Sequence, residues 1–169
     1  MSEAQTGAST QASAAATSAV EQRLEELGLT LPPVPAPVAA YVPAVISGNH
    51  VYTSGQLPTV SGKLTATGKV GAGVSADDAY DLSAICALNA LAAVKSVIGD
   101  LDRVTRVVKV GGFVASDPAF TGQPGVINGA SDLLGKVLGD AGVHARSAVG
   151  VAVLPLDAPV EVDLIVEFQ

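Results

Sequence analysis

Apolar residues alternate with polar or small ones along several stretches of the chain, the pattern of β-strands that bury one face. The first two stretches are separated by Gly48 and Asn49, a pair that favours a tight hairpin turn. Three longer, valine-rich stretches follow in the second half of the chain, and a shorter strand is expected before them. Strands are therefore predicted at residues 44–47, 50–54, 64–69, 103–115, 145–153 and 160–168.

Two other stretches, residues 76–98 and 126–138, repeat their apolar residues with the helical period and are predicted to be helices. Ser75 lies before the first of them as a cap, and Gly99 ends it. The order of strands and helices predicts an α+β sandwich, with two helices packed on one face of a mostly antiparallel, six-stranded sheet.

The N-terminal part of the chain has a different character. Its first residues are rich in Ala, Ser, Thr and Gln without periodicity, which predicts disorder. Ser18 and Glu21 then have the spacing of a helix capping box, and four prolines between Leu31 and Pro37 require an extended arm. The predicted organisation is a disordered segment 1–17, a helix and proline-rich arm 18–40, and a domain 41–169.

The composition limits the function classes. The chain has 169 residues, enough for one domain and few for two. Aromatic residues make up 4% and Trp is absent, so the core must consist of closely packed aliphatic side chains. The formal net charge is −7, and the nine basic residues are scattered. Because nucleic-acid binding needs a basic surface, we expect no nucleic-acid partner.

The single cysteine, Cys86, excludes an internal disulfide and fits a reducing compartment. It lies in an apolar helical stretch, so burial is expected rather than reactivity. The sequence shows no secretory signal and no uninterrupted apolar run of about 18 residues. We therefore predict a cytoplasmic protein without a membrane partner.

No metal or organic cofactor is predicted. His50 and His144 have no ligand spacing with each other or with Cys86. The glycine-rich run at residues 68–73 lacks both the ending and the strand-to-helix order of a phosphate-binding loop, which favours a flexible turn.

An arginine, Arg146, interrupts the apolar strand predicted at 145–153. With a period of two, its side chain shares a face with small residues such as Ala148 and Gly150, which leave space beside it. A half-buried guanidinium stays charged and needs an anion or several acceptors nearby, and its planar fork suits a carboxylate. The residues alone leave open a strand-end arginine that reaches solvent or forms a structural ion pair.

Several short motifs follow one another in a specific order from residue 41 to the C-terminus. They are Tyr41, Thr53-Ser54-Gly55-Gln56-Leu57-Pro58, Ala145-Arg146-Ser147, Leu154-Pro155 and Val160-Glu161-Val162-Asp163. In this combination the chain resembles the YjgF/RidA family of reactive-intermediate deaminases, once labelled endoribonuclease L-PSP. The resemblance implies a chorismate-mutase-like fold and a homotrimer with clefts between its subunits. It also implies hydrolysis of enamine or imine intermediates of 2-oxo acids to the keto acid and ammonia.

The resemblance gives the two catalytic candidates their roles: Arg146 would bind the substrate carboxylate, and Glu161 would hold and activate water. From spacing alone, the favoured interpretation of Glu161 is a solvated outer face of the strand, shared with Asp163 and Glu167. If the last two strands formed a simple hairpin, Arg146 and Glu161 would lie about seven residues apart along it, on the order of 23 Å. They could then meet only between subunits, in agreement with the implied trimer.

Four further residues are expected to contact the substrate: the resemblance implies it for Tyr41 and Asn128, and the position at a strand end suggests it for Ser54 and Gly55. Tyr41 would reach into the neighbouring subunit's cleft, and Asn128 matches an asparagine at the start of the family's second helix. The Ser54 hydroxyl and the Gly55 N–H would hold a carboxylate oxygen. Each position also has a plainer interpretation, as a half-buried tyrosine, a helix cap and turn residues respectively.

Two features depart from the family pattern. Family deaminases usually carry a cysteine two residues after the arginine, where this chain has Ala148, and the N-terminal arm is longer than in compact members. These departures keep a second function open: a non-catalytic trimer that binds small carboxylates or other metabolites through the same arginine.

Overall fold

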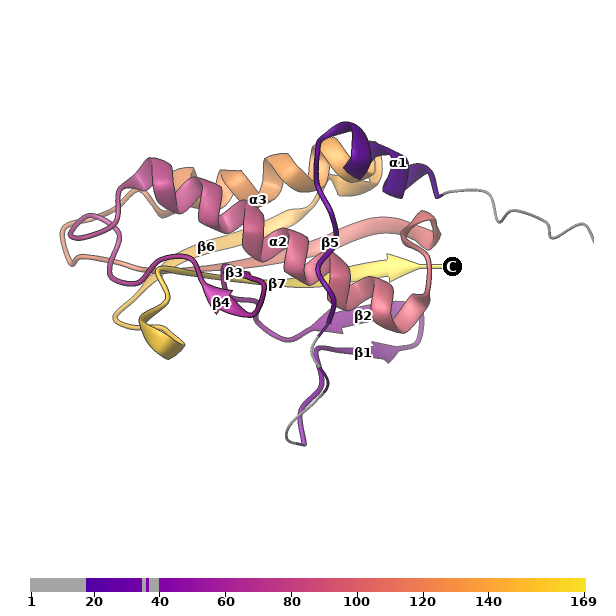
Figure 1. The fold of residues 1–169 in the computed structure, drawn as a ribbon, viewed down its shortest axis with the longest axis horizontal. Coiled ribbons are helices and arrows are strands. Elements are labelled where there is room, and N and C mark those ends of the chain that lie inside the picture. Colours follow the sequence, from indigo (N-terminus) through magenta and orange to yellow (C-terminus); the bar gives the residue numbers. More distant parts are fainter. Residues whose placement is uncertain (1–17, 35, 37–39) are drawn as a thin grey trace, which may run out of the picture.

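A computed structural model of the protein describes residues 18–34, 36 and 40–169. The disorder predicted for residues 1–17 lies outside this range. Within it, the chain forms one mixed sheet with two long helices on one face, and a short N-terminal helix beside them (Figure 1). The predicted α+β architecture, with both helices on the same face, is confirmed.

The sheet has five strands in the order β1-β2-β7-β5-β6, rather than the six that the sequence predicted. Neighbours are antiparallel except β5 and β6, which are parallel. The helix α3 connects these two strands, as a parallel pair requires. The strands are β1 (Ala44–Ser47), β2 (His50–Thr53), β5 (Val104–Ala115), β6 (Ala145–Val151) and β7 (Val160–Phe168).

The sixth predicted strand, at 64–69, is wrong. Of these residues only Leu64 is in a strand: β4 (Lys63–Leu64) pairs with β3 (Thr59–Val60) in a separate two-stranded hairpin, which turns through Ser61 and Gly62 at positive φ. The Asn89 side chain of α2 donates hydrogen bonds to the carbonyls of Leu57 and Thr59. These bonds hold the hairpin against the helix instead of at the sheet edge.

The final two strands do not pair with each other, so the simple hairpin expected around Asp157 is also wrong. The strand β5 lies between them, pairing with β6 on one side and with β7 on the other. At the turn before β7, Leu156 and Asp157 both adopt a left-handed backbone conformation, with φ of 59° and 60°.

The two long helices, α2 (Ala76–Ile98) and α3 (Gln123–Leu138), lie side by side over the sheet (Figure 1). As predicted, Ser75 caps α2: its hydroxyl accepts a hydrogen bond from the Asp78 N–H at 3.0 Å. The helices approach closely at Gly129, where a Cβ would overlap the Tyr80 carbonyl. Nearby, Ser83 donates to the Tyr80 and Val126 carbonyls and accepts from the Ala130 N–H.

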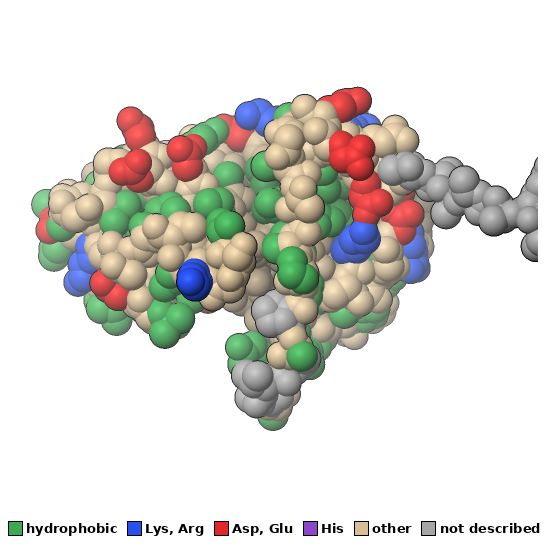
Figure 2. Space-filling model, in the orientation of Figure 1, with side chains coloured by type: hydrophobic (Ala, Val, Ile, Leu, Met, Phe, Trp, Pro, Cys, Tyr) green, Lys and Arg blue, Asp and Glu red, His purple; other side chains and the backbone are tan. Residues whose placement is uncertain are grey.

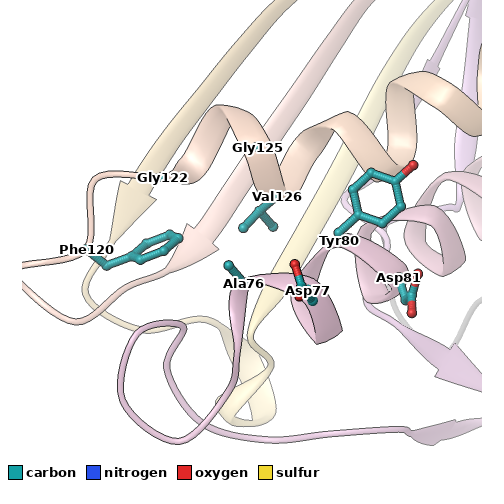
Figure 3. Close-up of a pocket in the computed structure, with 8 residues that line it drawn as sticks. All are labelled: Ala76, Asp77, Tyr80, Asp81, Phe120, Gly122, Gly125 and Val126. Carbon is teal, nitrogen blue, oxygen red and sulfur yellow. The ribbon is translucent and has the colours of Figure 1, made fainter.

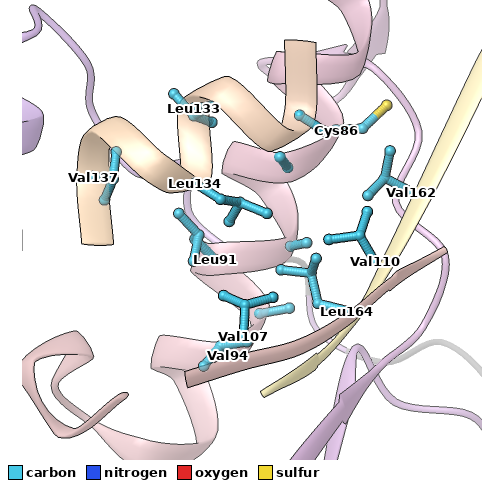
Figure 4. Packing of buried hydrophobic residues seen from close by; sticks show 14 of the residues in the cluster. Cys86, Leu91, Val94, Val107, Val110, Leu133, Leu134, Val137, Val162 and Leu164 are labelled. Atoms are coloured by element: carbon cyan, nitrogen blue, oxygen red, sulfur yellow. The ribbon is translucent and has the colours of Figure 1, made fainter. Parts of the chain in front are cut away.

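The core lies between these helices and the sheet and is almost entirely aliphatic (Figure 4). Cys86 belongs to it, which confirms its predicted burial, and this burial raises the pKa of the thiol well above its usual range. By length and composition α2 could cross a membrane, but 61% of its most apolar window is buried inside this fold. The labelled core residues in Figure 4 are Cys86, Leu91, Val94, Val107, Val110, Leu133, Leu134, Val137, Val162 and Leu164.

The predicted N-terminal helix is present as α1 (Ala19–Glu26), capped by Ser18. The carboxylate of Asp102, in a short 3-10 turn before β5, accepts hydrogen bonds from the Ser18 hydroxyl and from the Ala19 and Val20 N–H groups. The Val20 N–H and the Ser18 hydroxyl, in that order, lower the pKa of Asp102. These bonds fix α1 against the domain.

Candidate functional site

Arg146 projects from β6 on the face that the helices cover, because it pairs with the buried Val110 of β5. Its Nη1 donates to the Asn128 Oδ1 at 2.8 Å and to the Ser131 Oγ at 3.1 Å, and its Nη2 donates to the Pro124 carbonyl at 3.2 Å. All three partners belong to α3, and Asn128 and Ser131 share one face of that helix at a spacing of three residues. The guanidinium is therefore held by neutral acceptors.

No carboxylate lies within ion-pair distance of Arg146 in the part of the chain that the structure describes. The structural ion pair that spacing alone left open is therefore not formed with any described residue. A half-buried cation held only by neutral groups can still gain energy from an anionic ligand. The arrangement is suited to binding a small carboxylate.

The space expected beside Arg146 is occupied. Ala148 pairs with Gly112, and a Cβ on Gly112 would overlap the Ile127 side chain of α3. A Cβ on Gly150 would lie 2.8 Å from the Gln123 amide nitrogen. The small residues of β6 and β5 thus allow α3 to lie close to the sheet, and this approach brings its acceptors to Arg146.

Asn128 has a different position from the one expected. The helix α3 begins at Gln123, three residues before the predicted start, with Pro124 in its first turn where proline is tolerated. Asn128 therefore lies inside the helix and is not its cap. Its side chain is exposed apart from the contact with Arg146, so it remains available to a ligand bound there.

Glu161 lies on the opposite face of the sheet, which we call the open face because no described helix covers it. Its neighbours along β7, Val160 and Val162, point into the core. Paired hydrogen bonds between Gln56 and Val162 bring Gly55 alongside, and a Cβ on Gly55 would overlap the Glu161 carboxylate. Because Gly55 in the sequence Ser-Gly-Gln has no side chain, it leaves the space that the Glu161 carboxylate occupies.

The surroundings of Glu161 make its carboxylate a stronger base than an ordinary glutamate. Burial raises the pKa of its carboxyl, and the charge of Asp163 raises it further. Asp163 lies two residues along the same face and packs over Gly111. Burial also raises the pKa of Asp163, although the Gly111 N–H and Lys109 act in the other direction. Two half-buried carboxyl groups therefore lie next to each other on the open face.

Two further predicted residues lie near the Gly55 end of β2. The Ser54 hydroxyl donates to the Val42 carbonyl at 2.6 Å, and the Ser54 N–H donates to the Pro43 carbonyl. Through these bonds the end of β2 holds the segment that carries Tyr41. The Tyr41 side chain is 65% exposed.

The predicted residues thus form two separate groups within one chain. Arg146 and Asn128 make the first group, between β6 and α3, and Glu161 and Gly55 belong to the second, on the open face. In the register of the sheet, Arg146 of β6 lies at the level of Leu164 of β7, and Glu161 of β7 lies at the level of Val149 of β6. Arg146 and Glu161 are therefore three residues apart along the strands and two strands apart across the sheet. This places their backbones about 10 Å apart in each direction, instead of the ~23 Å of a hairpin. The side chains still cannot meet, because they lie on opposite faces.

An open pocket of about 380 Å³ lies between the first turns of α2 and α3 (Figure 3). It is lined by Asp77 and Asp81 together with the rings of Tyr80 and Phe120, and by none of the predicted site residues. The two acidic side chains would repel a carboxylate ligand, so this pocket is not suited to the chemistry of Arg146.

On the face shown in Figure 2, the Lys and Arg side chains are separate and acidic groups lie along the helix side. Among the residues that the structure describes, no group of three or more His, Cys, Asp or Glu side chains could hold a metal ion.

Comparison with known proteins gives the family. Residues 21–168 match the model of the family described as "YjgF/chorismate_mutase-like, putative endoribonuclease". The chain belongs to the YjgF/Rid family. The resemblance noted from the short motifs is thereby confirmed, together with the chorismate-mutase-like fold.

Three known proteins are similar to this chain to different degrees. The structure of Atu1372 from Agrobacterium tumefaciens, a protein of unknown function, is 53% identical with a TM-score of 0.85, covering 89% of this chain and 93% of that one. Protein TCP17 of Trypanosoma cruzi is 46% identical over 158 residues, covering 93% of this chain and 99% of the relative. Escherichia coli TdcF with bound serine shares the fold, at 24% identity and a TM-score of 0.59, covering 80% and 94%.

Two residues at the arginine site were missed by the sequence analysis. Ser131 accepts a hydrogen bond from Arg146, and His144 lies at 2.9 Å from the Ser131 Oγ. The periodicities contained a signal for both: Ser131 follows Asn128 by three residues on a helix, and His144 precedes Arg146 by two residues at the start of a strand.

Proposed function

We propose that this YjgF/Rid protein hydrolyses reactive imine and enamine intermediates of 2-oxo acids, giving the keto acid and ammonia, in clefts between the subunits of a homotrimer. The observation that carries the proposal is the state of Arg146. Its guanidinium is half-buried, held by three neutral acceptors and without a carboxylate partner among the described residues. Some members of the family are imine deaminases, which agrees with this chemistry.

The residues have complementary roles in the proposed reaction. Arg146 binds the substrate carboxylate and fixes the position of the adjacent imine carbon, and Asn128 contributes an amide at the same place. Glu161 accepts a proton from water as the water oxygen attacks that carbon. The proton passes from Glu161 to the nitrogen, which gives a carbinolamine. The hydroxyl proton of this intermediate then also reaches the nitrogen, the C–N bond breaks, ammonia leaves and the C=O bond forms, so one water is consumed for each keto acid released. Because such imines hydrolyse spontaneously, a modest acceleration suffices.

The separation of the two groups of residues supports an oligomer, and we propose that it is a trimer. Within one chain Arg146 and Glu161 lie on opposite faces, so a site that contains both needs a second subunit. The open face offers a surface for that contact, since Val45, Tyr52 and Val149 on it are between 42% and 49% exposed. Three copies that close their open faces around one axis would bury these side chains and create three equivalent clefts. In each cleft Tyr41 and Ser54, Gly55 and Glu161 would face the arginine of the neighbour.

The ligand class is supported by chemistry rather than by a close relative. TdcF binds serine, which is a small α-amino carboxylate. Serine is therefore a useful probe of binding at Arg146, in addition to the 2-oxo acids that are the products of the proposed reaction.

A coupled assay tests the activity. An amino-acid dehydratase or oxidase generates the imine in situ, and keto-acid release is compared between wild type, the Arg146→Ala variant and a reaction without the protein. We expect faster release with wild type alone. Equal rates in all three reactions, for short and branched substrates, would refute the deaminase. If calorimetry then still showed 2-oxo acid binding that depends on Arg146, the protein would be a carboxylate-binding trimer without catalysis.

A further inference from the structure

A continuous line of hydrogen bonds runs from the backbone to Arg146. The His144 Nδ1 lies 2.6 Å from the Gly142 carbonyl oxygen, and its Nε2 lies 2.9 Å from the Ser131 Oγ. The Arg146 Nη1 donates to the same Ser131 oxygen at 3.1 Å. The line thus joins the loop before β6, the helix α3 and the strand β6 at the point where the guanidinium lies.

For a neutral imidazole ring, the Gly142 carbonyl gives the direction of each bond. A carbonyl oxygen only accepts, so the His144 Nδ1 must carry a proton. In the neutral imidazole the Nε2 is then an acceptor, and the Ser131 hydroxyl donates to it. The hydroxyl proton therefore points away from Arg146, and the lone pairs of the Ser131 oxygen face the guanidinium. With the opposite tautomer, the histidine would not order the serine in this way.

The Gly142 carbonyl is a rigid anchor for this line. Gly142 ends a short 3-10 turn, Gly139–Gly142, after α3, and a Cβ on it would overlap the Leu134 carbonyl. The residue is buried and packed against the helix backbone. The position of His144 is therefore set by the same helix that supplies Ser131.

The line determines which donors of the guanidinium remain for a ligand. Arginine has five N–H donors. The Nη1 uses both of its hydrogens on Asn128 and Ser131, and the Nη2 uses one on Pro124. Two donors, the Nε–H and the second Nη2–H, have no partner among the described residues. The two remaining donors can bind both oxygens of a carboxylate only if the plane of the guanidinium is held fixed.

We propose that Ser131 and His144 are positioning residues for the carboxylate-binding arginine: the neutral His144, protonated on Nδ1, orients the Ser131 hydroxyl so that it fixes the plane of the Arg146 guanidinium. The inference rests on the proposed function to the extent that Arg146 binds a carboxylate. It adds a specificity determinant, because a fixed fork discriminates a carboxylate from an uncharged group of the same shape. A purely structural link between β6 and α3 would not affect that discrimination.

Calorimetry with 2-oxobutanoate and with its uncharged amide, 2-oxobutanamide, tests this role. We expect Ser131→Ala and His144→Phe to weaken 2-oxobutanoate binding about tenfold and to leave binding of the amide unchanged. Ser131→Thr keeps the hydroxyl and should restore carboxylate affinity. Ser96→Ala is the matched control, because Ser96 is another helix serine whose hydroxyl donates only to a carbonyl of its own helix, that of Ala93.

Three outcomes would overturn the proposal. Wild-type carboxylate affinity in Ser131→Ala, while Arg146→Ala loses binding, would refute the positioning role and leave the proposed function intact. An equal loss for acid and amide would show a structural role only. Since a variant could fail to fold, long-range ¹H–¹⁵N spectra of the wild-type protein provide a further test: a His144 ring protonated on Nε2 instead of Nδ1 would also refute it. Undiminished binding by Arg146→Ala would instead contradict the proposed function itself.

Discussion

Arg146 and Glu161 project from opposite faces of one sheet, with only the strand β5 between the strands that carry them. Arg146 is held by α3 on the covered face, whereas Glu161 lies on the open face beside Gly55. The fold of one chain therefore keeps apart the two residues that we propose to act together. A site that contains both residues requires a neighbouring copy of the chain, and variants of Arg146 and of Glu161 test what each residue contributes.

Replacing Arg146 by alanine should abolish activity and weaken 2-oxo acid binding by about 3 kcal/mol, roughly a 100-fold loss, because the ligand carboxylate loses its charged partner. The fold should persist, since Ala148 already lies on the same face of β6. Calorimetry measures the affinity and circular dichroism checks the fold. The Arg146→Lys variant should fail nearly as severely, because a point charge cannot reproduce the planar fork. Full binding by the lysine variant would show that charge alone is sufficient.

Replacing Glu161 by glutamine should separate binding from turnover. The amide keeps the size and the hydrogen bonding of the carboxylate but cannot accept a proton from water. Affinity for a 2-oxo acid should stay close to that of wild type, while the keto-acid release rate falls to the uncatalysed level. If turnover survived in this variant, Glu161 would be no more than a half-buried carboxylate of the open face.

Local periodicity predicted the helices and the main strands, but it could not predict how the strands are arranged. The boundaries of α2 and β7 agree with the sequence because capping residues and alternation are local signals. The position of β5 between β6 and β7 depends on contacts between distant parts of the chain. The strand–helix–strand order around α3 did contain a signal for a parallel pair, because such a connection normally crosses over to form one.

The candidate site was only partly predictable for the same reason. Arg146 was identified as unusual by a charge in an apolar strand, and Glu161 mainly by resemblance. The neutral acceptors around Arg146 come from a different element, so their contact depends on the close packing of α3 over Gly112. The small residues of β6 indicate free space on this face, but they do not indicate which element fills it.

The acid limb of the pH–rate profile should lie above pH 4.5, the ordinary pKa of a glutamate. Burial first, and the charge of Asp163 second, raise the pKa of Glu161, so the catalytic carboxylate forms only at higher pH. Asp163→Asn removes the second cause and should move the limb to lower pH, although burial keeps it above 4.5. Initial rates measured over a pH series give the limb for both proteins. An unchanged limb would show that the two carboxyl groups do not interact in the working enzyme.

The same shifts have a defined sign for stability. Both carboxyl groups have raised pKa values in the folded protein, so they contribute stability below their ordinary values of 4.5 and 3.8. This contribution is lost as the pH rises through the folded-state values. The free energy of unfolding of Asp163→Asn minus that of wild type should therefore be larger at neutral pH than at pH 3. Chemical denaturation of both proteins at the two pH values measures this difference.

The close contact between α2 and α3 gives a prediction about stability. Gly129→Ala should lower the free energy of unfolding by about 2 kcal/mol, because the new Cβ overlaps the rigid Tyr80 carbonyl and the helices must move apart. Gly135→Ala is the matched control in the same helix, since a Cβ there meets nothing within 4 Å. It should stabilise the protein by up to about 1 kcal/mol through helix propensity. Equal denaturation midpoints for the two variants would contradict the close packing.

The last prediction tests whether Arg146 and Glu161 meet between subunits. Arg146→Ala and Glu161→Gln subunits are each expected to be inactive alone. If a site takes its arginine from one chain and its glutamate from the next, random mixing in equal amounts leaves about one site in four with both groups intact. The mixture should then recover about a quarter of the wild-type activity. Subunits carrying both substitutions, mixed in equal amounts with wild type, are the control: sites within one chain would leave half of the activity, whereas shared sites would again leave a quarter. Light scattering that reports a stable monomer at micromolar concentration would refute both the trimer and the shared site.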